Sequence, residues 1–214
     1  MTNDELFSQL LDKISSFDYI HADQIPNIDL YMDQVTTFMD EQLAASKRYE
    51  SDKILTKTMI NNYAKNNLLP SPDKKKYSKE HVLTLLFIYY FKNILSINDI
   101  RSILNPLTEK YFGNDDGFTM QDVYTEVFSL EAEESKKLLK DLGKKYKIAG
   151  ETFEDFPDED QKFLHTFSFI CMLSFDVYIK KMLIERMIDN LNEEEASSHE
   201  NTHSGKESKK TGSK

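Results

Sequence analysis

Side chains that bind phosphate groups are concentrated between residues 53 and 79. This segment contains seven lysines and one aspartate, a net charge of +6, and because the whole chain carries −10 the remaining residues carry −16. A confined basic stretch in an acidic chain is typical of a phosphate-binding surface, because the acidic surroundings repel nucleic acid everywhere else. A solvated lysine-rich loop produces the same pattern, and charge alone favours that second interpretation.

A helix from Thr56 to Asn66 is predicted to position two of these lysines. Thr56 is a good N-cap, and large apolar residues recur at helical spacing along one side of the segment. The apolar side consists of Leu55, Met59, Ile60 and Tyr63, and the opposite face holds Lys57, Thr58, Asn61, Asn62 and Lys65. Because an asparagine amide can make two hydrogen bonds to adenine, a binding role for Asn61 and Asn62 is favoured over plain solvated surface.

Four of the remaining lysines follow two prolines that forbid a continuing helix. Pro70 and Pro72 frame a turn that leads into an extended segment from Lys74 to Tyr77, where a small β hairpin, or wing, is expected.

Two capped helices are expected after the wing. Ser78 begins a helix whose body, Val82 to Phe91, is apolar on nearly all sides and is therefore predicted to be buried. Ser96, with Asp99 three residues later, begins a second helix that we expect to end at Pro106.

Helical spacing also extends over the rest of the chain, which predicts an all-α protein. Further helices are expected at Asp4 to Phe17, Asp29 to Leu43, Thr119 to Phe128, Ser129 to Leu142 and Asp158 to Leu191. The first of them is expected to bury a stripe of Leu6, Leu10, Ile14 and Phe17. Beyond Asn192 the chain has no large apolar residue, so this tail is predicted to be disordered.

The predicted helix from Asp158 to Leu191 contains an apolar stretch, Phe163 to Ile179. This stretch includes His165 and Asp176 and is shorter than the roughly 20 residues that cross a bilayer, so no membrane span is expected. Apolar residues at three- and four-residue steps predict homodimerisation through a seam of Phe163, Phe167, Ile170, Val177, Ile184, Ile188 and Leu191. Phe163, Phe167, Phe169, Ile170 and Leu173 also suit an effector pocket, although plain core packing is favoured.

Catalysis and metal binding are not expected. The single cysteine, Cys171, excludes internal disulfides and multi-cysteine metal sites, and it fits a reducing compartment. The histidines lack metal-ligand spacing, the acids from Asp155 to Asp160 are ordinary partners of a helix N-terminus, and no glycine-rich phosphate loop is present. We therefore predict no enzyme and no resident cofactor or metal. Met1 to Leu11 lacks the features of a signal peptide, so a cytoplasmic location is expected.

The order of these features resembles the MerR-type winged helix-turn-helix. The similarity covers Thr58 to Pro70, Lys74 to Ser78 and Phe91 to Leu104. In that family the recognition helix ends with an aromatic residue and a Gly-Leu-Leu-Pro-like stop, and a basic-Tyr-Ser wing and two supporting helices follow. Asn67 stands at the glycine position and is expected to adopt the same left-handed conformation. Over most of its length before the tail, the chain also resembles a bacterial family of unknown function with a MerR-like core.

The resemblance implies a DNA-binding transcriptional regulator, with a recognition helix in the major groove of double-stranded DNA and the wing on its backbone. The expected contact residues are Lys57, Thr58, Asn61, Asn62, Lys65, Lys74, Lys75, Lys76 and Tyr77. The alternative is a protein-interaction module on a winged-helix scaffold that does not bind DNA. The predicted organisation is an N-terminal helix at 1–28, the winged helix at 29–112, a helical region for dimerisation or effector binding at 113–191, and the disordered tail at 192–214.

Overall fold

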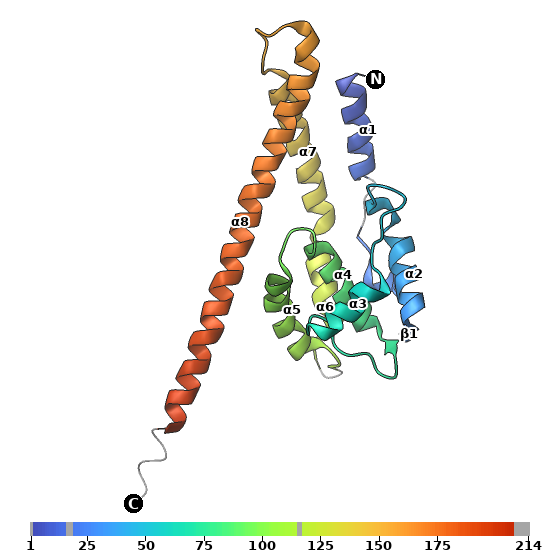
Figure 1. Ribbon diagram of the computed structural model, residues 1–214, viewed down its shortest axis with the longest axis vertical. Coiled ribbons are helices and arrows are strands. Elements are labelled where there is room, and N and C mark those ends of the chain that lie inside the picture. Colours follow the sequence, from blue (N-terminus) through green and yellow to red (C-terminus); the bar gives the residue numbers. More distant parts are fainter. Residues whose placement is uncertain (1, 16–18, 115–116, 208–214) are drawn as a thin grey trace, which may run out of the picture.

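The computed structural model describes residues 2–15, 19–114 and 117–207. It is mostly helical with one two-stranded sheet, which confirms the all-α class (Figure 1). In chain order the elements are α1 (Asn3–Ser15), η1 (Ala22–Gln24), β1 (Leu30–Tyr31), α2 (Met32–Gln42), η2 (Ala44–Ser46), α3 (Lys57–Lys65), β2 (Lys76–Tyr77), α4 (Lys79–Phe91), α5 (Ile97–Tyr111), α6 (Met120–Ser129), α7 (Glu131–Gly150) and α8 (Asp158–Glu207).

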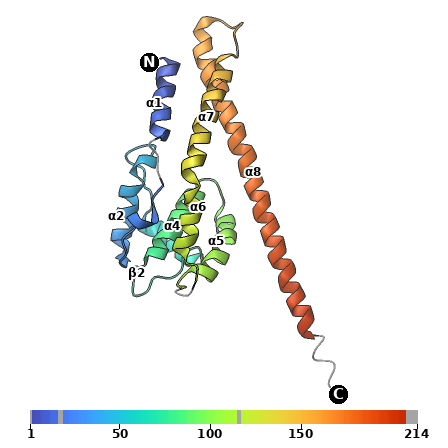
Figure 2. The ribbon, with the colours of Figure 1, turned by 180° about the vertical axis from the view of Figure 1, so that it is seen from behind.

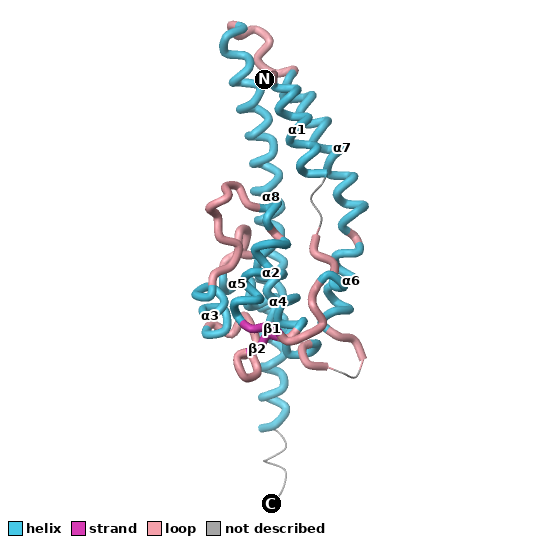
Figure 3. The backbone as a smooth tube through the Cα atoms, turned by 90° about the vertical axis from the view of Figure 1, so that its right-hand side faces the viewer, coloured by secondary structure: helices cyan, strands magenta, loops and turns pink. Residues whose placement is uncertain are grey.

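Helix α4 is the centre of the compact lower part of the molecule. Every residue from His81 to Tyr89 is buried, because this helix is apolar on all sides and needs neighbours around its whole circumference. Helices α2, α3, α5 and α6 contribute buried side chains to the same cluster, among them Val35, Ile60, Ile100 and Met120. Figure 3 shows the two short strands beside these helices at the lower end of the compact part.

Helix α6 belongs to this core, so the boundary predicted after residue 112 does not separate two cores. Met120 and Tyr124 are buried with the α4 residues, and the Tyr124 hydroxyl donates a 2.7 Å hydrogen bond to the carbonyl oxygen of Ile20. Gly113 and Gly117 have φ angles of 68° and 104°, which let the chain turn between α5 and α6. The looser composition there marks a turn within one unit, because the apolar face of α6 packs against α4.

Helices α1 and α7 and the first part of α8 form the upper part of the molecule (Figures 1 and 2). The Phe7 ring of α1 stacks on Tyr146 of α7 at a centroid distance of 3.9 Å, and its edge meets Phe169 of α8 at 5.6 Å. The Tyr146 hydroxyl donates a 2.8 Å hydrogen bond to Asp4, and burial together with this bond raises the pKa of Tyr146 to about 12. An aromatic contact thus joins the three helices.

The apolar stripe predicted for the first helix is only partly buried. Leu10 and Ile14 are exposed, Leu6 is half-buried, and Phe17 lies outside the described residues. Because α7 is the principal neighbour of α1, only a narrow strip around Phe7 is covered.

Helix α8 is 50 residues long, and its two halves pack through different faces. Its first part lies along α7, where Lys145 of α7 forms ion pairs with Asp141 and with Asp176 of α8, and where Cys171 is half-buried. Farther on, α8 leaves α7 and contacts α5, and there Ile188 is buried (Figure 1). None of the described helices has a stretch long and apolar enough to span a membrane.

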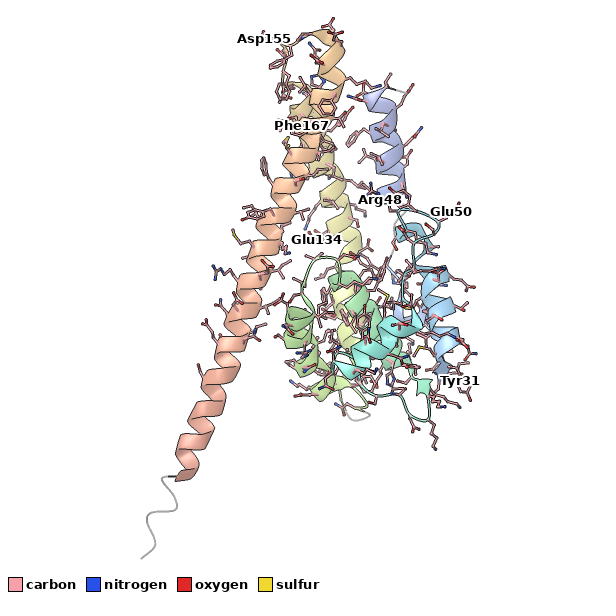
Figure 4. The ribbon with its side chains drawn as sticks, viewed as in Figure 1. Tyr31, Arg48, Glu50, Glu134, Asp155 and Phe167 are labelled. Atoms are coloured by element: carbon pink, nitrogen blue, oxygen red, sulfur yellow. The ribbon has the colours of Figure 1, made fainter. Side chains whose placement is uncertain are left out.

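Many large apolar side chains of α8 remain exposed, and Figure 4 shows side chains projecting from the sides of α8 that no other helix covers. They are Phe163, Phe167, Ile170, Phe175, Val177, Tyr178, Ile179, Met182, Leu183, Ile184, Met187 and Leu191. Of the seam predicted for dimerisation, Ile188 is therefore part of the core of its own chain, while the other six residues are exposed.

Helices α5 and α7 end later than the sequence predicted. Helix α5 continues through Pro106 to Tyr111, because Leu104 and Leu107 on either side of the proline pack into the core and offset the hydrogen bond that proline cannot donate. Helix α7 begins at Glu131 without a cap from Ser129, and it continues to Gly150 because its last turns pack against α1 and α8.

Helix α8 also extends beyond its predicted end. It continues past Leu191 to Glu207, into the segment 192–214 predicted to be disordered, of which residues 208–214 lie outside the described residues. The run Glu193 to Ala196 consists of strong helix formers, and adding residues to a helix that already exists costs no new nucleation.

Candidate nucleic-acid interface

Helix α3 is short, and both of its ends are fixed by local hydrogen bonds. The Thr56 hydroxyl accepts a 3.2 Å bond from the backbone N–H of Met59, as expected for an N-cap. At the other end, the N–H groups of Asn67 and Leu68 donate to the carbonyl oxygens of Ala64 and Tyr63 at 3.2 and 2.9 Å. This is a Schellman motif, and Asn67 adopts the predicted left-handed conformation with φ 56°.

The two faces of α3 have opposite chemistry. Ile60 and Tyr63 are buried in the core, and burial raises the pKa of Tyr63. Five of the predicted contact residues lie on the other face, and all of them are exposed: Lys57, Thr58, Asn61, Asn62 and Lys65. The helix therefore presents two amides, one hydroxyl and two ammonium groups to solvent from a rigid backbone.

The lysines predicted to form a wing lie in and directly after a tight turn. Lys74 and Lys75 have φ angles of 47° and 68°, and the N–H of Lys76 donates a 2.8 Å bond to the carbonyl oxygen of Asp73. Two consecutive left-handed residues closed by this bond are typical of a type I′ turn, in which Asn-Gly is the usual pair. The extended segment predicted from Lys74 therefore starts only at Lys76, and Lys74 and Lys75 are held exposed at the tip.

Strand β2 pairs with β1 near the N-terminus of α2, so the sheet is not formed by the turn alone. The register places Leu30 opposite Tyr77 and Tyr31 opposite Lys76 in an antiparallel pair. The Lys76 ammonium lies 5.6 Å from the centre of the Tyr31 ring, which is 55% exposed. Figure 4 shows Tyr31 at the outer edge of the compact part.

Tyr77 is the predicted contact residue that the structure removes from the surface. Its side chain is 3% exposed and packs edge-on against the His81 ring at 5.5 Å. Successive residues of a strand point to opposite faces, so Tyr77 points into the core while the half-buried Lys76 points away from it. The prediction of a DNA contact by Tyr77 is therefore wrong, and its role is to hold the wing on the core.

His81 connects the wing to α4 and α5. The N–H of Ser78 donates a 3.0 Å bond to His81 Nδ1, and His81 Nε2 lies 3.4 Å from the carbonyl oxygen of Ser71, to which it can donate as the neutral tautomer. The ring also makes an edge-to-face contact with Phe112 at a centroid distance of 4.7 Å. Burial lowers the pKa of His81, because an imidazolium would lose its hydration and the Ser78 bond.

Three charged or aromatic residues beside α3 and β2 were not found from the sequence. Asp33 of α2 forms an ion pair with Lys57, and Tyr31 lies under Lys76. Arg101 of α5 donates a 3.0 Å bond to the carbonyl oxygen of Asn66, at the C-terminal end of α3. These pairings join residues from different elements, so no local pattern in the sequence reveals them.

The described residues were also compared with the metal sites and the effector pocket that the sequence raised. No group of three or more His, Cys, Asp or Glu side chains among them is close enough to hold a metal ion. The aromatic set considered for an effector pocket does not enclose one, since Phe163 and Phe167 are exposed and stack on each other at a centroid distance of 6.1 Å. A hollow of about 470 Å³ near the top is lined instead by Asn3, Asp4, Tyr146, Lys147, Gly150 and His165.

A sequence profile described as "Domain of unknown function (DUF1836)" matches residues 20–127. The match begins at Ile20, which accepts the Tyr124 hydrogen bond, and ends within α6, so it coincides with the compact core and contains the whole candidate interface. No curated protein and no solved structure matches the chain.

Proposed function

The chain belongs to the DUF1836 family, and from the geometry of α3 and the lysine turn we propose that it is a DNA-binding transcriptional regulator with a MerR-like winged helix. The observation that carries this proposal is the outer face of α3, where Asn61, Asn62 and Lys65 are exposed opposite a buried apolar face. A helix of this diameter fits the roughly 12 Å wide major groove of B-DNA.

The exposed side chains divide into two roles. The amides of Asn61 and Asn62 reach base edges, where an adenine offers one acceptor and one donor to a single amide. Lys57 and Lys65 at the two ends of α3, together with Lys74, Lys75 and Lys76 of the turn, bind phosphates and so fix the position of the helix in the groove. Arg101 lies at the C-terminal end of α3 and suits a further phosphate contact.

Fluorescence anisotropy with mixed genomic DNA fragments tests the proposal before any operator sequence is known. Wild type is expected to bind with an affinity that falls steeply with salt, because three turn lysines release the counterions of about three phosphates. The variant Lys74→Glu, Lys75→Glu, Lys76→Glu is expected to bind all sequences more weakly, by at least tenfold at low salt.

A matched variant separates the effect of the turn from that of net charge. Lys136→Glu, Lys140→Glu, Lys144→Glu makes the same charge change at exposed positions of α7, remote from α3. It is expected to bind almost as wild type does. Equal weak binding by wild type and both variants would contradict DNA binding.

Base reading is tested separately on a sequence selected from the bound fragments. Asn61→Ala or Asn62→Ala is expected to cost about 1–3 kcal/mol at the selected site and little on random DNA. An equal loss on both DNAs would assign these amides to the backbone instead.

A second candidate function is a protein-interaction module, which is favoured by the exposed apolar side chains of α8. Phe163, Phe175 and Leu183 are 70%, 68% and 60% exposed, and large exposed apolar patches mark interaction sites. In the first proposal these side chains serve homodimerisation, which would also match a two-fold symmetric DNA site.

A further inference from the structure

The free face of the lower half of α8 is an apolar stripe with a basic side chain on each flank. Phe175, Ile179, Leu183 and Met187 follow each other at four-residue steps, so they line one side of the helix, and each is more than half exposed. By the same geometry Lys180 and Arg186 lie on the two flanks of the stripe, and both are exposed. This face continues the one that packs on α7 higher up, beyond the point where the two helices separate (Figure 2).

A groove of complementary character runs along α6, and we call it the α6 groove. It consists of two hollows of about 640 and 400 Å³ that share Val127, one between the end of α5 and α6 and the other where α6 meets α7. Phe118, Val127 and Leu130 in its walls are 75%, 51% and 64% exposed. The charged residues that line it within the described chain are Asp122, Glu126, Glu131 and Glu134, all acidic.

We infer that the α8 stripe of one copy of the chain docks in the α6 groove of a second copy, and that the second copy returns the same contact. This inference rests on the homodimer of the proposed function and specifies its interface. An apolar helix face with Lys180 on its flank matches an apolar groove lined by Glu126 in both hydrophobicity and charge. Arg186 and Glu134 already pair with Asp189 and Lys137 of their own chain. Because the two surfaces differ, two-fold symmetry makes two equivalent contacts.

The size of the two surfaces agrees with a stable dimer. The stripe from Phe175 to Met187 is roughly 20 Å long at 1.5 Å per residue, and α6 with the first turns of α7 offers a groove of about that length. Seven exposed apolar side chains per protomer would be covered, four on the stripe and three in the groove. At about 100–150 Å² for each of them this is roughly 800 Å² per protomer, which is the size of a standard specific interface.

Light scattering at micromolar concentration tests the inference with one substitution on each surface. Leu183→Asp changes the stripe and Val127→Asp changes the groove, and both residues are exposed, so neither substitution removes core packing. Wild type is expected to be a dimer, and each variant is expected to dissociate at least tenfold more readily. Ile148→Asp, at an exposed apolar position of α7 outside both surfaces, is the matched control and is expected to remain a dimer.

Mixing the two variants distinguishes this arrangement from a pairing of α8 with itself. An equimolar mixture of Leu183→Asp and Val127→Asp retains one unaltered contact, from the α8 of the groove variant to the groove of the α8 variant, so dimers are expected to reappear. If Val127→Asp dimerises as tightly as wild type, the groove is not the docking site and the inference is overturned, while the homodimer itself stands. A monomeric wild type overturns both the docking inference and the homodimer. Circular dichroism of each variant verifies that it is folded.

Discussion

At the scale of single residues, the interface depends on side chains that differ in exposure although they are neighbours in sequence. Lys76 is half-buried with its ammonium over the exposed Tyr31 ring, whereas Tyr77 is buried, and burial raises the pKa of the Tyr77 hydroxyl. His81 under Tyr77 is buried in its neutral form, with Nδ1 accepting the Ser78 bond. The position of the wing thus depends on one imidazole remaining unprotonated.

The stability of the protein is therefore expected to fall in mild acid. Because burial lowers the folded-state pKa of His81, its contribution to the unfolding free energy is complete above its unfolded pKa of about 6.5 and is lost as the pH falls from there toward the folded pKa. Urea unfolding at pH 7.5 and 5.5 measures this loss. His81→Gln is expected to be less stable at pH 7.5 and to lose less between the two pH values; an equal loss in both proteins would assign the acid sensitivity to other groups.

At the scale of elements, the N-caps of the helices could be predicted from the sequence, whereas the contacts between distant elements could not. Thr56, Ser78, Ser96 and Thr119 each begin a helix in the structure, because an N-cap acts through bonds within four residues. The burial of Tyr77 and the continuation of α5 past Pro106 depend on contacts with distant elements, which no local pattern contains.

The candidate site, too, could be predicted only in the parts that depend on local sequence. The exposed face of α3 could be derived from helical spacing, whereas the pairing of β2 with β1, and with it the place of Tyr31, could not. The length of α8 also exceeded its sequence prediction, because low hydrophobicity argues against packing but not against a helix that continues from a packed one.

The lysine turn is expected to combine strain with function. A left-handed conformation costs a residue with a side chain on the order of 1 kcal/mol, and Asn-Gly adopts it readily. Lys74→Asn, Lys75→Gly is therefore expected to raise the unfolding free energy by about 1 kcal/mol or more and to weaken DNA binding by removing two charges. Denaturant unfolding and anisotropy on the same protein check both effects; a destabilised variant would contradict the turn geometry.

At the scale of the whole molecule, one compact core carries a long helix whose last part has no described packing partner. The core residues lie between Ile20 and Tyr124, with Ile188 as the one member contributed by α8. The segment after Asn192 has no large apolar side chain. Its helical conformation therefore contributes little to the stability of the fold.

Removal of residues 193–214 is expected to leave the folded core unchanged. The helix beyond Asn192 buries no large apolar group, so its loss takes away no hydrophobic stabilisation. Thermal unfolding of residues 1–192 is expected to give a Tm within about 2 °C of the full chain, which corresponds to less than about 1 kcal/mol. A fall of several degrees would show that the C-terminal turns of α8 do contact the core.

The half-buried Cys171 gives this chain a built-in reporter, because it is the single cysteine and lies where α8 runs along α7. Because the thiol is only partly accessible while α8 packs on α7, a thiol reagent reacts faster when α8 has opened locally, so changes in the labelling rate report on that opening. The same reaction followed at increasing protein concentration would reveal whether association of two chains slows the motion. The opening of α8 can therefore be followed through Cys171 without introducing another residue.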